Sequence, residues 1–212
     1  SFGAVRAVDG IDLDIQENEF FALLGASGSG KTTLLRMLAG FEMPTAGEIM
    51  LDGKDITHVQ PNHRPVNLMF QSYALFPHMT IAQNIAYGLE MEKLPKSEIK
   101  QRVEEMLEVI QLSHLAKRKP DQLSGGQRQR VAIARATVTE PNVLLADEPT
   151  GNLDHKSGED VINVLESLNN RGITLLVVTH DLELGVRAHR QLKMRDGCIV
   201  SNQLNTTSHA SP

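Results

Sequence analysis

Short apolar runs alternate along this chain with stretches in which apolar residues recur at helical spacing. The apolar runs predict buried strands at 20–24, 66–70, 143–149 and 173–178. The helical spacing predicts helices at 33–39, from the cap Ser97 to Ile110, from Gly125 onward, and in a segment that ends near Gly172. This alternation is typical of an α/β fold, in which helices pack on a sheet.

Three further segments have simpler patterns. Residues 5–15 alternate apolar and polar side chains, which predicts a half-buried strand. Residues 47–56 predict two strands with a tight turn at Asp52-Gly53. We expect these strands to form a small antiparallel sheet. The polar residues 201–212 predict a frayed tail.

The stretch with the most specific chemistry follows the first predicted strand and reads Gly25-Ala26-Ser27-Gly28-Ser29-Gly30-Lys31-Thr32. A strand, this glycine pattern and then a helix are the context of a phosphate-binding loop, whose N–H groups point into one concavity. We expect Lys31 to reach the β- and γ-phosphates and Thr32 to hold Mg²⁺. A glycine-rich turn without a ligand is the alternative, but the flanking strand and helix favour a nucleoside triphosphate site.

Polar side chains follow the other predicted strands. Gln71 ends the second strand, where open α/β sheets bind ligands. Asp147 and Glu148 end the third, and adjacent acids at a buried strand end are costly unless a cation or a reaction uses them. We expect Asp147 to bind Mg²⁺ and Glu148 to orient or deprotonate the attacking water. His180 follows the last strand and could be either a γ-phosphate contact or an ordinary loop histidine.

Two further features could contact a nucleotide. Ser124 precedes Gly125-Gly126-Gln127 at a predicted helix start, which could bind an anion but by itself is more often a capped turn. Phe2 is one of few aromatic residues and could stack on a base; from its position alone, a frayed end is an equal alternative.

Composition excludes several classes of protein. The formal charge of −5 gives no basic footprint, so we expect no nucleic-acid partner. The single Cys198 excludes a disulfide framework and a cysteine-rich zinc site. No signal pattern is present, and no apolar run approaches the roughly 20 residues that span a bilayer. We expect a cytoplasmic protein that reaches a membrane only through another subunit.

Together these motifs resemble the nucleotide-binding subunit of ATP-binding cassette (ABC) transporters. The resemblance covers nearly the whole chain and is carried by GASGSGKT (25–32), Gln71, LSGGQ (123–127), VLLADEP (143–149), GNLD (151–154) and His180. It implies a P-loop NTPase with a RecA-like core at 1–74 and 136–200, which includes an N-terminal antiparallel β subdomain. A helical subdomain is expected at 75–135 and the polar tail at 201–212.

The resemblance also implies a head-to-tail dimer, either a homodimer or a pair with another ABC subunit, that holds two ATP molecules. Each site would combine Lys31 of one chain with the Ser124 turn of the other. Glu148 resembles the general base, His180 the γ-phosphate sensor, Phe2 the adenine-stacking residue and Gln71 the Mg²⁺ and coupling residue. The expected ATP contacts are Phe2, Gly25, Ala26, Ser27, Gly28, Ser29, Gly30, Lys31, Thr32, Thr33, Gln71, Ser124, Gly125, Gly126 and Gln127. The expected Mg²⁺ ligands are Thr32, Gln71 and Asp147.

The segment Tyr73–Met79 combines apolar side chains with Pro77, which predicts a docking loop more than a core helix. The resemblance places the coupling helix of a transmembrane permease at this loop. It implies a subunit on the cytoplasmic face of the plasma membrane, and import, with a possible periplasmic binding protein, is favoured. The first half looks like importers of polyamines, ferric iron or sugars, and the second half like lipoprotein-release and macrolide-export ATPases.

Two alternatives remain at this point. A non-transport cassette protein acting on DNA or ribosomes usually has tandem cassettes, coiled-coil insertions or zinc modules, and this sequence has none of these. A degenerate cassette would bind ATP without turnover, but Glu148 and His180 are both present. The sequence departs from the family in lacking the edge strand before Phe2 and the C-terminal regulatory domain of polyamine- and sugar-type importers.

Overall fold

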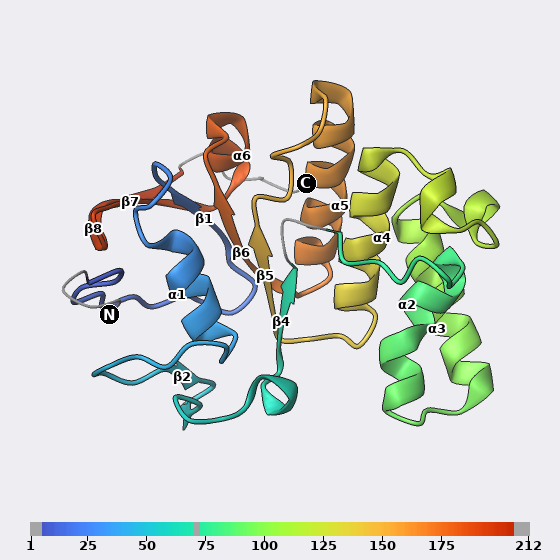
Figure 1. The fold of residues 1–212 in the computed structure, drawn as a ribbon. Coiled ribbons are helices and arrows are strands. Elements are labelled where there is room, and N and C mark those ends of the chain that lie inside the picture. Colours follow the sequence, from blue (N-terminus) through green and yellow to red (C-terminus); the bar gives the residue numbers. More distant parts are fainter. Residues whose placement is uncertain (1–5, 70–72, 206–212) are drawn as a thin grey trace, which may run out of the picture.

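A six-stranded sheet forms the centre of the computed structural model, which describes residues 6–69 and 73–205 (Figure 1). Its strand order is β4-β5-β6-β1-β7-β8, and every neighbouring pair is parallel except β7 and β8. The strands are β1 (Phe20–Leu24), β4 (Val66–Met69), β5 (Val143–Asp147), β6 (Thr174–Thr179), β7 (Arg190–Arg195) and β8 (Cys198–Leu204). The mixed α/β fold predicted from the apolar runs is therefore confirmed.

The two faces of the sheet are covered by different helices. Along β1, Phe20 and Ala22 belong to one buried cluster, while Phe21 and Leu23 belong to another. This division follows from the strand itself, because successive side chains point to opposite faces. Helix α1 (Lys31–Leu38) packs on the face of Phe21, and α4 (Gly125–Thr137) and α5 (His155–Asn170) cover the face of Phe20 (Figure 1). Helix α6 (Leu182–Arg187) connects β6 to β7.

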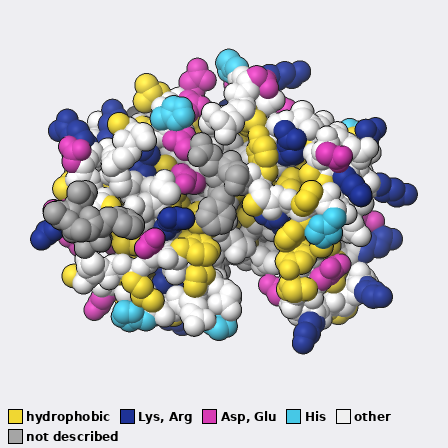
Figure 2. Space-filling view, viewed as in Figure 1, with side chains coloured by type: hydrophobic (Ala, Val, Ile, Leu, Met, Phe, Trp, Pro, Cys, Tyr) yellow, Lys and Arg dark blue, Asp and Glu magenta, His cyan; other side chains and the backbone are white. Residues whose placement is uncertain are grey.

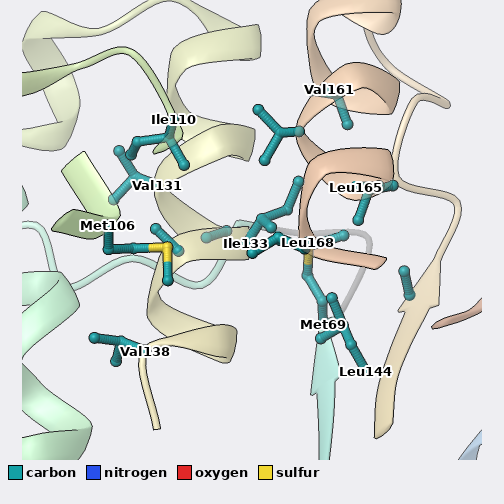
Figure 3. Close-up of a cluster of buried hydrophobic side chains, with 14 of the residues drawn as sticks. Met69, Met106, Ile110, Val131, Ile133, Val138, Leu144, Val161, Leu165 and Leu168 are labelled. Carbon is teal, nitrogen blue, oxygen red and sulfur yellow. The ribbon is translucent and has the colours of Figure 1, made fainter. Parts of the chain in front are cut away.

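Helices α2 (Ile81–Met91) and α3 (Lys96–Val109) lie on the far side of α4 from the sheet (Figure 1). Side chains from α3, α4, α5, β4 and β5 meet in one buried cluster (Figure 3). Full burial of each such aliphatic side chain stabilises the fold by about 1.5–3 kcal/mol. Because α4 is buried both toward the sheet and toward α2, it joins the helical part to the strands.

The predicted hairpin is confirmed. Strands β2 (Met50–Leu51) and β3 (Lys54–Asp55) pair antiparallel, and Asp52 and Gly53 both have positive φ, as the tight turn requires. Three short 3₁₀ segments lie at Pro61–His63, Ser113–Leu115 and Pro120–Gln122. Within the described residues, β2 and β3 are the only antiparallel pair outside the main sheet.

The predicted strand at 5–15 is wrong over its described part, since residues 6–15 contain no strand. The alternation still reports burial, because Val8, Ile11, Leu13 and Ile15 pack on the cluster that contains Phe21. A strand requires a neighbouring backbone to pair with, and among the described residues the segment 6–15 makes one backbone–backbone hydrogen bond, from the Asp9 N–H to the Gly197 carbonyl.

Three other boundaries differ from the prediction. Ser97 is not an N-cap, because the helix begins at Lys96 after Pro95. The strand predicted at 143–149 ends at Asp147, since Glu148 is left-handed. Residues 201–204 are not frayed but belong to β8, which pairs with β7; neither strand was predicted.

Charged side chains of both signs are interspersed on the face shown in Figure 2. This agrees with the absence of a basic footprint in the composition. No helix in the described ranges 6–69 and 73–205 is long and apolar enough to cross a membrane.

Candidate nucleotide-binding site

The glycine-rich loop lies between β1 and α1, as predicted. Gly30 immediately precedes α1 at φ 97°, and a Cβ there would overlap the Ala7 carbonyl oxygen. A Cβ on Gly25 would lie 2.5 Å from the Met194 carbonyl oxygen. Both positions therefore require glycine, and residues 26–28 remain exposed at the mouth of the loop.

The Lys31 side chain folds back into this loop. Its Nζ donates to the carbonyl oxygens of Gly25, at 2.7 Å, and Ala26, at 2.9 Å. Burial lowers the pKa of Lys31, while the charges of Glu148 and Asp147 oppose that shift. Lys31 forms no ion pair within the described residues, and its ammonium is satisfied by neutral carbonyls. A buried cation of this kind fits a phosphate ligand.

Thr32 and Asp147 come together from α1 and β5. The Thr32 hydroxyl donates to Asp147, with Oγ1 3.2 Å from Oδ2. Burial raises the pKa of Asp147, whereas the Thr32 hydrogen bond lowers it. The described residues contain no group of three or more His, Cys, Asp or Glu that could hold a metal ion. A hydroxyl and one carboxylate instead fit Mg²⁺, which keeps several waters and takes phosphate oxygens as ligands.

The ends of β5 and β6 bring Glu148 and His180 into contact. His180 Nδ1 lies 2.8 Å from Glu148 Oε2. The Glu148 side chain is 17% exposed and the His180 side chain 70%. Glu148 has φ 49°, and its N–H donates to the Val178 carbonyl at 2.8 Å. That backbone conformation ends β5 and turns the carboxylate toward the loop after β6.

The Ser124 turn begins α4 with reciprocal caps. Ser124 Oγ accepts from the Gln127 N–H at 3.2 Å, and Gln127 Oε1 accepts from the Ser124 N–H at 3.0 Å. This capping box confirms Ser124 as N-cap. A Cβ on Gly126 would lie 2.7 Å from Ser157 Cβ, so this glycine is needed where α4 packs on α5.

The structure places the two predicted anion sites on different faces of the sheet. Lys31 begins α1 on the face of Phe21, whereas Ser124 precedes α4 on the face of Phe20 (Figure 1). The remaining predicted ligands, Phe2 and Gln71, lie outside the described residues.

Contacts that the sequence did not reveal surround the predicted docking loop. Arg128 and Arg135 of α4 hold it, with Arg128 over the Tyr73 ring at 5.3 Å and Arg135 over the Phe76 ring at 5.4 Å. Arg135 also donates to the Ala74 carbonyl at 2.7 Å, and burial lowers its pKa. The sequence did contain a signal for these contacts: Arg128 and Arg135 are two helical turns apart, which places them on the same face of α4. Tyr73 and Leu75 pack against the core, so the loop is only partly a surface.

A parallel α/β sheet with this loop, lysine and paired threonine and aspartate defines a P-loop nucleotide-binding domain. A family model described as ABC transporter matches residues 8–151, and the chain belongs to the ABC transporter family. Domains of this family bind and hydrolyse ATP and generally require Mg²⁺. The predicted family, P-loop fold and ATPase class are thereby confirmed.

Relatives and solved structures agree with this family. The putrescine transport ATP-binding protein PotG of Escherichia coli K12 is 58% identical over 184 residues, which cover 86% of this chain and 49% of PotG. The spermidine/putrescine import ATP-binding protein PotA of Marinobacter nauticus is 53% identical over 207 residues, which cover 97% of this chain and 55% of PotA. The chain thus spans about half the length of the curated relatives it matches.

Two solved cassettes have the same fold. The dimeric post-hydrolysis structure of the cassette MJ0796 with ADP and phosphate is 34% identical, with a TM-score of 0.84; the match covers 97% of this chain and 94% of that one. The cassette MJ1267 is 29% identical, with a TM-score of 0.87; the match covers 96% of this chain and 87% of that one.

Proposed function

We propose that this chain hydrolyses ATP to drive import through membrane permease subunits, with polyamines as the substrate class. The substrate class comes from the names of the relatives, which include putrescine and spermidine/putrescine import proteins. The observation that carries the ATPase assignment is the convergence of Lys31, Thr32–Asp147 and Glu148–His180 at the ends of β1, β5 and β6.

In this proposal the phosphate loop binds the triphosphate and Lys31 exchanges its carbonyl partners for β- and γ-phosphate oxygens. Thr32 and Asp147 hold Mg²⁺, with Gln71 as the third predicted ligand. Bound Mg²⁺ would neutralise charge on the phosphates. The loop contacts are those predicted from Gly25 to Thr33, and Phe2 stacks on the adenine.

Glu148 accepts a proton from, or orients, the water that attacks the γ-phosphate. His180 is proposed as the γ-phosphate sensor. Its contact with Glu148 restrains the carboxylate, and its largely exposed ring leaves a nitrogen available to a ligand.

We propose that two chains assemble head to tail. The Ser124-Gly125-Gly126 turn lies on the opposite face from the phosphate loop, so it would act on the nucleotide of a second chain. The solved MJ0796 cassette is dimeric, which supports the assembly of two chains; the head-to-tail orientation is part of the proposal. Gln127 caps its own helix, and its expected ATP contact remains a prediction.

The permease is proposed to dock at Tyr73–Met79, with the chain on the cytoplasmic face of the membrane. Figure 2 shows hydrophobic side chains on both sides of the hollow between the sheet and the helical part. The division into a core at 1–74 and 136–200 and a helical subdomain at 75–135 is proposed on the packing of α2 and α3 away from the sheet.

Glu148→Gln tests the catalytic proposal. The isosteric amide cannot accept the proton, so turnover should fall by about 10²- to 10⁴-fold while equilibrium ATP binding is retained. Glu104→Gln, on the exposed side of α3, is the matched control and should keep the wild-type rate. A Glu148→Gln protein that hydrolyses ATP at nearly the wild-type rate contradicts the assignment.

A further inference from the structure

Gln129 is a fully buried polar residue in the second turn of α4, with 2% of its surface exposed. Its Nε2 donates to the Pro149 carbonyl oxygen at 2.7 Å. Because a carbonyl can only accept, this bond fixes which end of the amide points to Pro149. Pro149 follows Glu148 directly, so Gln129 joins the helix of the Ser124 turn to the peptide after the proposed general base.

The amide oxygen of Gln129 does not contribute a hydrogen bond to the fold. Among the described residues, Gln129 Oε1 has no hydrogen-bond partner. A buried acceptor without a partner costs stability, and an apolar residue of the same shape avoids that cost. Neighbours of Gln129 on α4, such as Val131 and Ile133, are fully buried and apolar. A methionine at position 129 would therefore fill the same space and stabilise the fold at least as well as glutamine.

The backbone that Gln129 holds is an unusual one. Glu148 is left-handed, which is an uncommon conformation for a residue other than glycine. Such a conformation persists only where the surroundings impose it. Two backbone hydrogen bonds restrain Glu148 here: its N–H donates to the Val178 carbonyl, and its carbonyl accepts from the Gly151 N–H at 3.2 Å. The side chain of Gln129 restrains the following residue by donating to the Pro149 carbonyl.

We propose that Gln129 is a positioning residue that holds Glu148 in its catalytic orientation and links that orientation to the Ser124 turn. Gln129 lies little more than one helical turn after Ser124, so a displacement of α4 reaches Pro149 through one hydrogen bond. This inference rests on the proposed function. In a head-to-tail dimer, ATP bound by the partner at Ser124 would influence the glutamate that serves this chain's own ATP.

The test compares Gln129→Met with Thr137→Val. Thr137 is also a buried polar residue of α4, but its hydroxyl donates to the Ile133 carbonyl and lies near Met106 Sδ of α3, and no hydrogen bond among the described residues joins it to Glu148 or Pro149. Gln129→Met should lower kcat about 10- to 100-fold, as expected for a misplaced catalytic group. The ATP dissociation constant should not rise, and the unfolding midpoint should not fall. Thr137→Val should keep the wild-type kcat. Gln129→Leu replaces Gln129→Met if the latter does not fold.

A double mutant tests whether Gln129 acts through Glu148. In single-turnover measurements, Gln129→Met should have no further effect in the Glu148→Gln background, because the group that it positions is already lost. If the rate losses of the two single variants multiply in the double mutant, the two residues act independently and the inference is overturned. A wild-type kcat in Gln129→Met would also overturn it. These outcomes are separate from failure of the proposed function, in which the wild-type chain itself would not hydrolyse ATP.

Discussion

His180 Nδ1 lies 2.8 Å from Glu148 Oε2, although 32 residues separate the two in the sequence. The contact joins the ends of two adjacent parallel strands, β5 and β6. The imidazole donates to the carboxylate when Nδ1 carries the proton. The two residues that the sequence singled out for different roles thus form one unit, and a change in either should affect the other.

Lys31→Ala should weaken the binding of ATP itself. The ammonium makes charge-assisted bonds worth about 1.5–3 kcal/mol, so affinity should fall about 10- to 100-fold. Equilibrium binding of labelled ATP measures this. Lys100→Ala on the exposed surface of α3 is the control. Unchanged affinity in Lys31→Ala would count against the phosphate-loop assignment.

Ser124→Arg should leave ATP binding by the monomer intact and block hydrolysis, because this exposed residue would act on the partner's nucleotide. In a mixed dimer with Lys31→Ala chains, both changes fall in one site and the other site is intact. Partial recovery of ATPase activity on mixing supports shared sites. Strong activity of Ser124→Arg by itself contradicts them.

Asp147→Asn should stabilise the nucleotide-free protein at neutral pH. Burial raises the pKa of Asp147 above its unfolded value, so the native state binds the proton more tightly. The free energy of unfolding therefore falls as the pH rises from the pKa of Asp147 in the unfolded chain to its pKa in the folded protein. This loss of stability persists at neutral pH. Thermal unfolding from pH 3 to 7 should show the gain at neutral pH and little difference at acid pH. The exposed Asp12→Asn is the control.

The same Asp147→Asn protein should bind Mg²⁺-ATP more weakly, because the carboxylate charge is lost. ATP affinity measured with and without Mg²⁺ separates the two effects. Undiminished Mg²⁺ dependence would contradict the metal-site assignment, whereas lower stability at neutral pH would contradict the stability prediction.

Phe76→Ala should have a small effect on stability and a large effect on coupling to the permease. Phe76 is only partly buried, against Tyr87 and Arg135. Its truncation should cost much less than the about 3–5 kcal/mol expected for the fully buried Phe20→Ala. Chemical denaturation compares the two variants. An equal loss in Phe76→Ala would mean that this ring belongs to the core.

Local patterns account for the parts of the fold that were predicted correctly. The phosphate loop, the Ser124 N-cap and the Asp52-Gly53 turn depend on residues within a few positions of one another. Their backbone conformations are largely decided by glycine, by caps and by the adjoining apolar run. The sequence by itself therefore determined the nucleotide-binding family and most of the helices and buried strands.

Only the tertiary structure decided how distant segments pair. The alternating residues 6–15 are half-buried without becoming a strand, while the polar residues 201–204 become one because β7 offers a paired edge. The Gln129–Pro149 bond and the Glu148–His180 contact likewise join separate elements. Backbone hydrogen bonding and side-chain contact over such separations depend on strand order and helix packing, which no local pattern specifies.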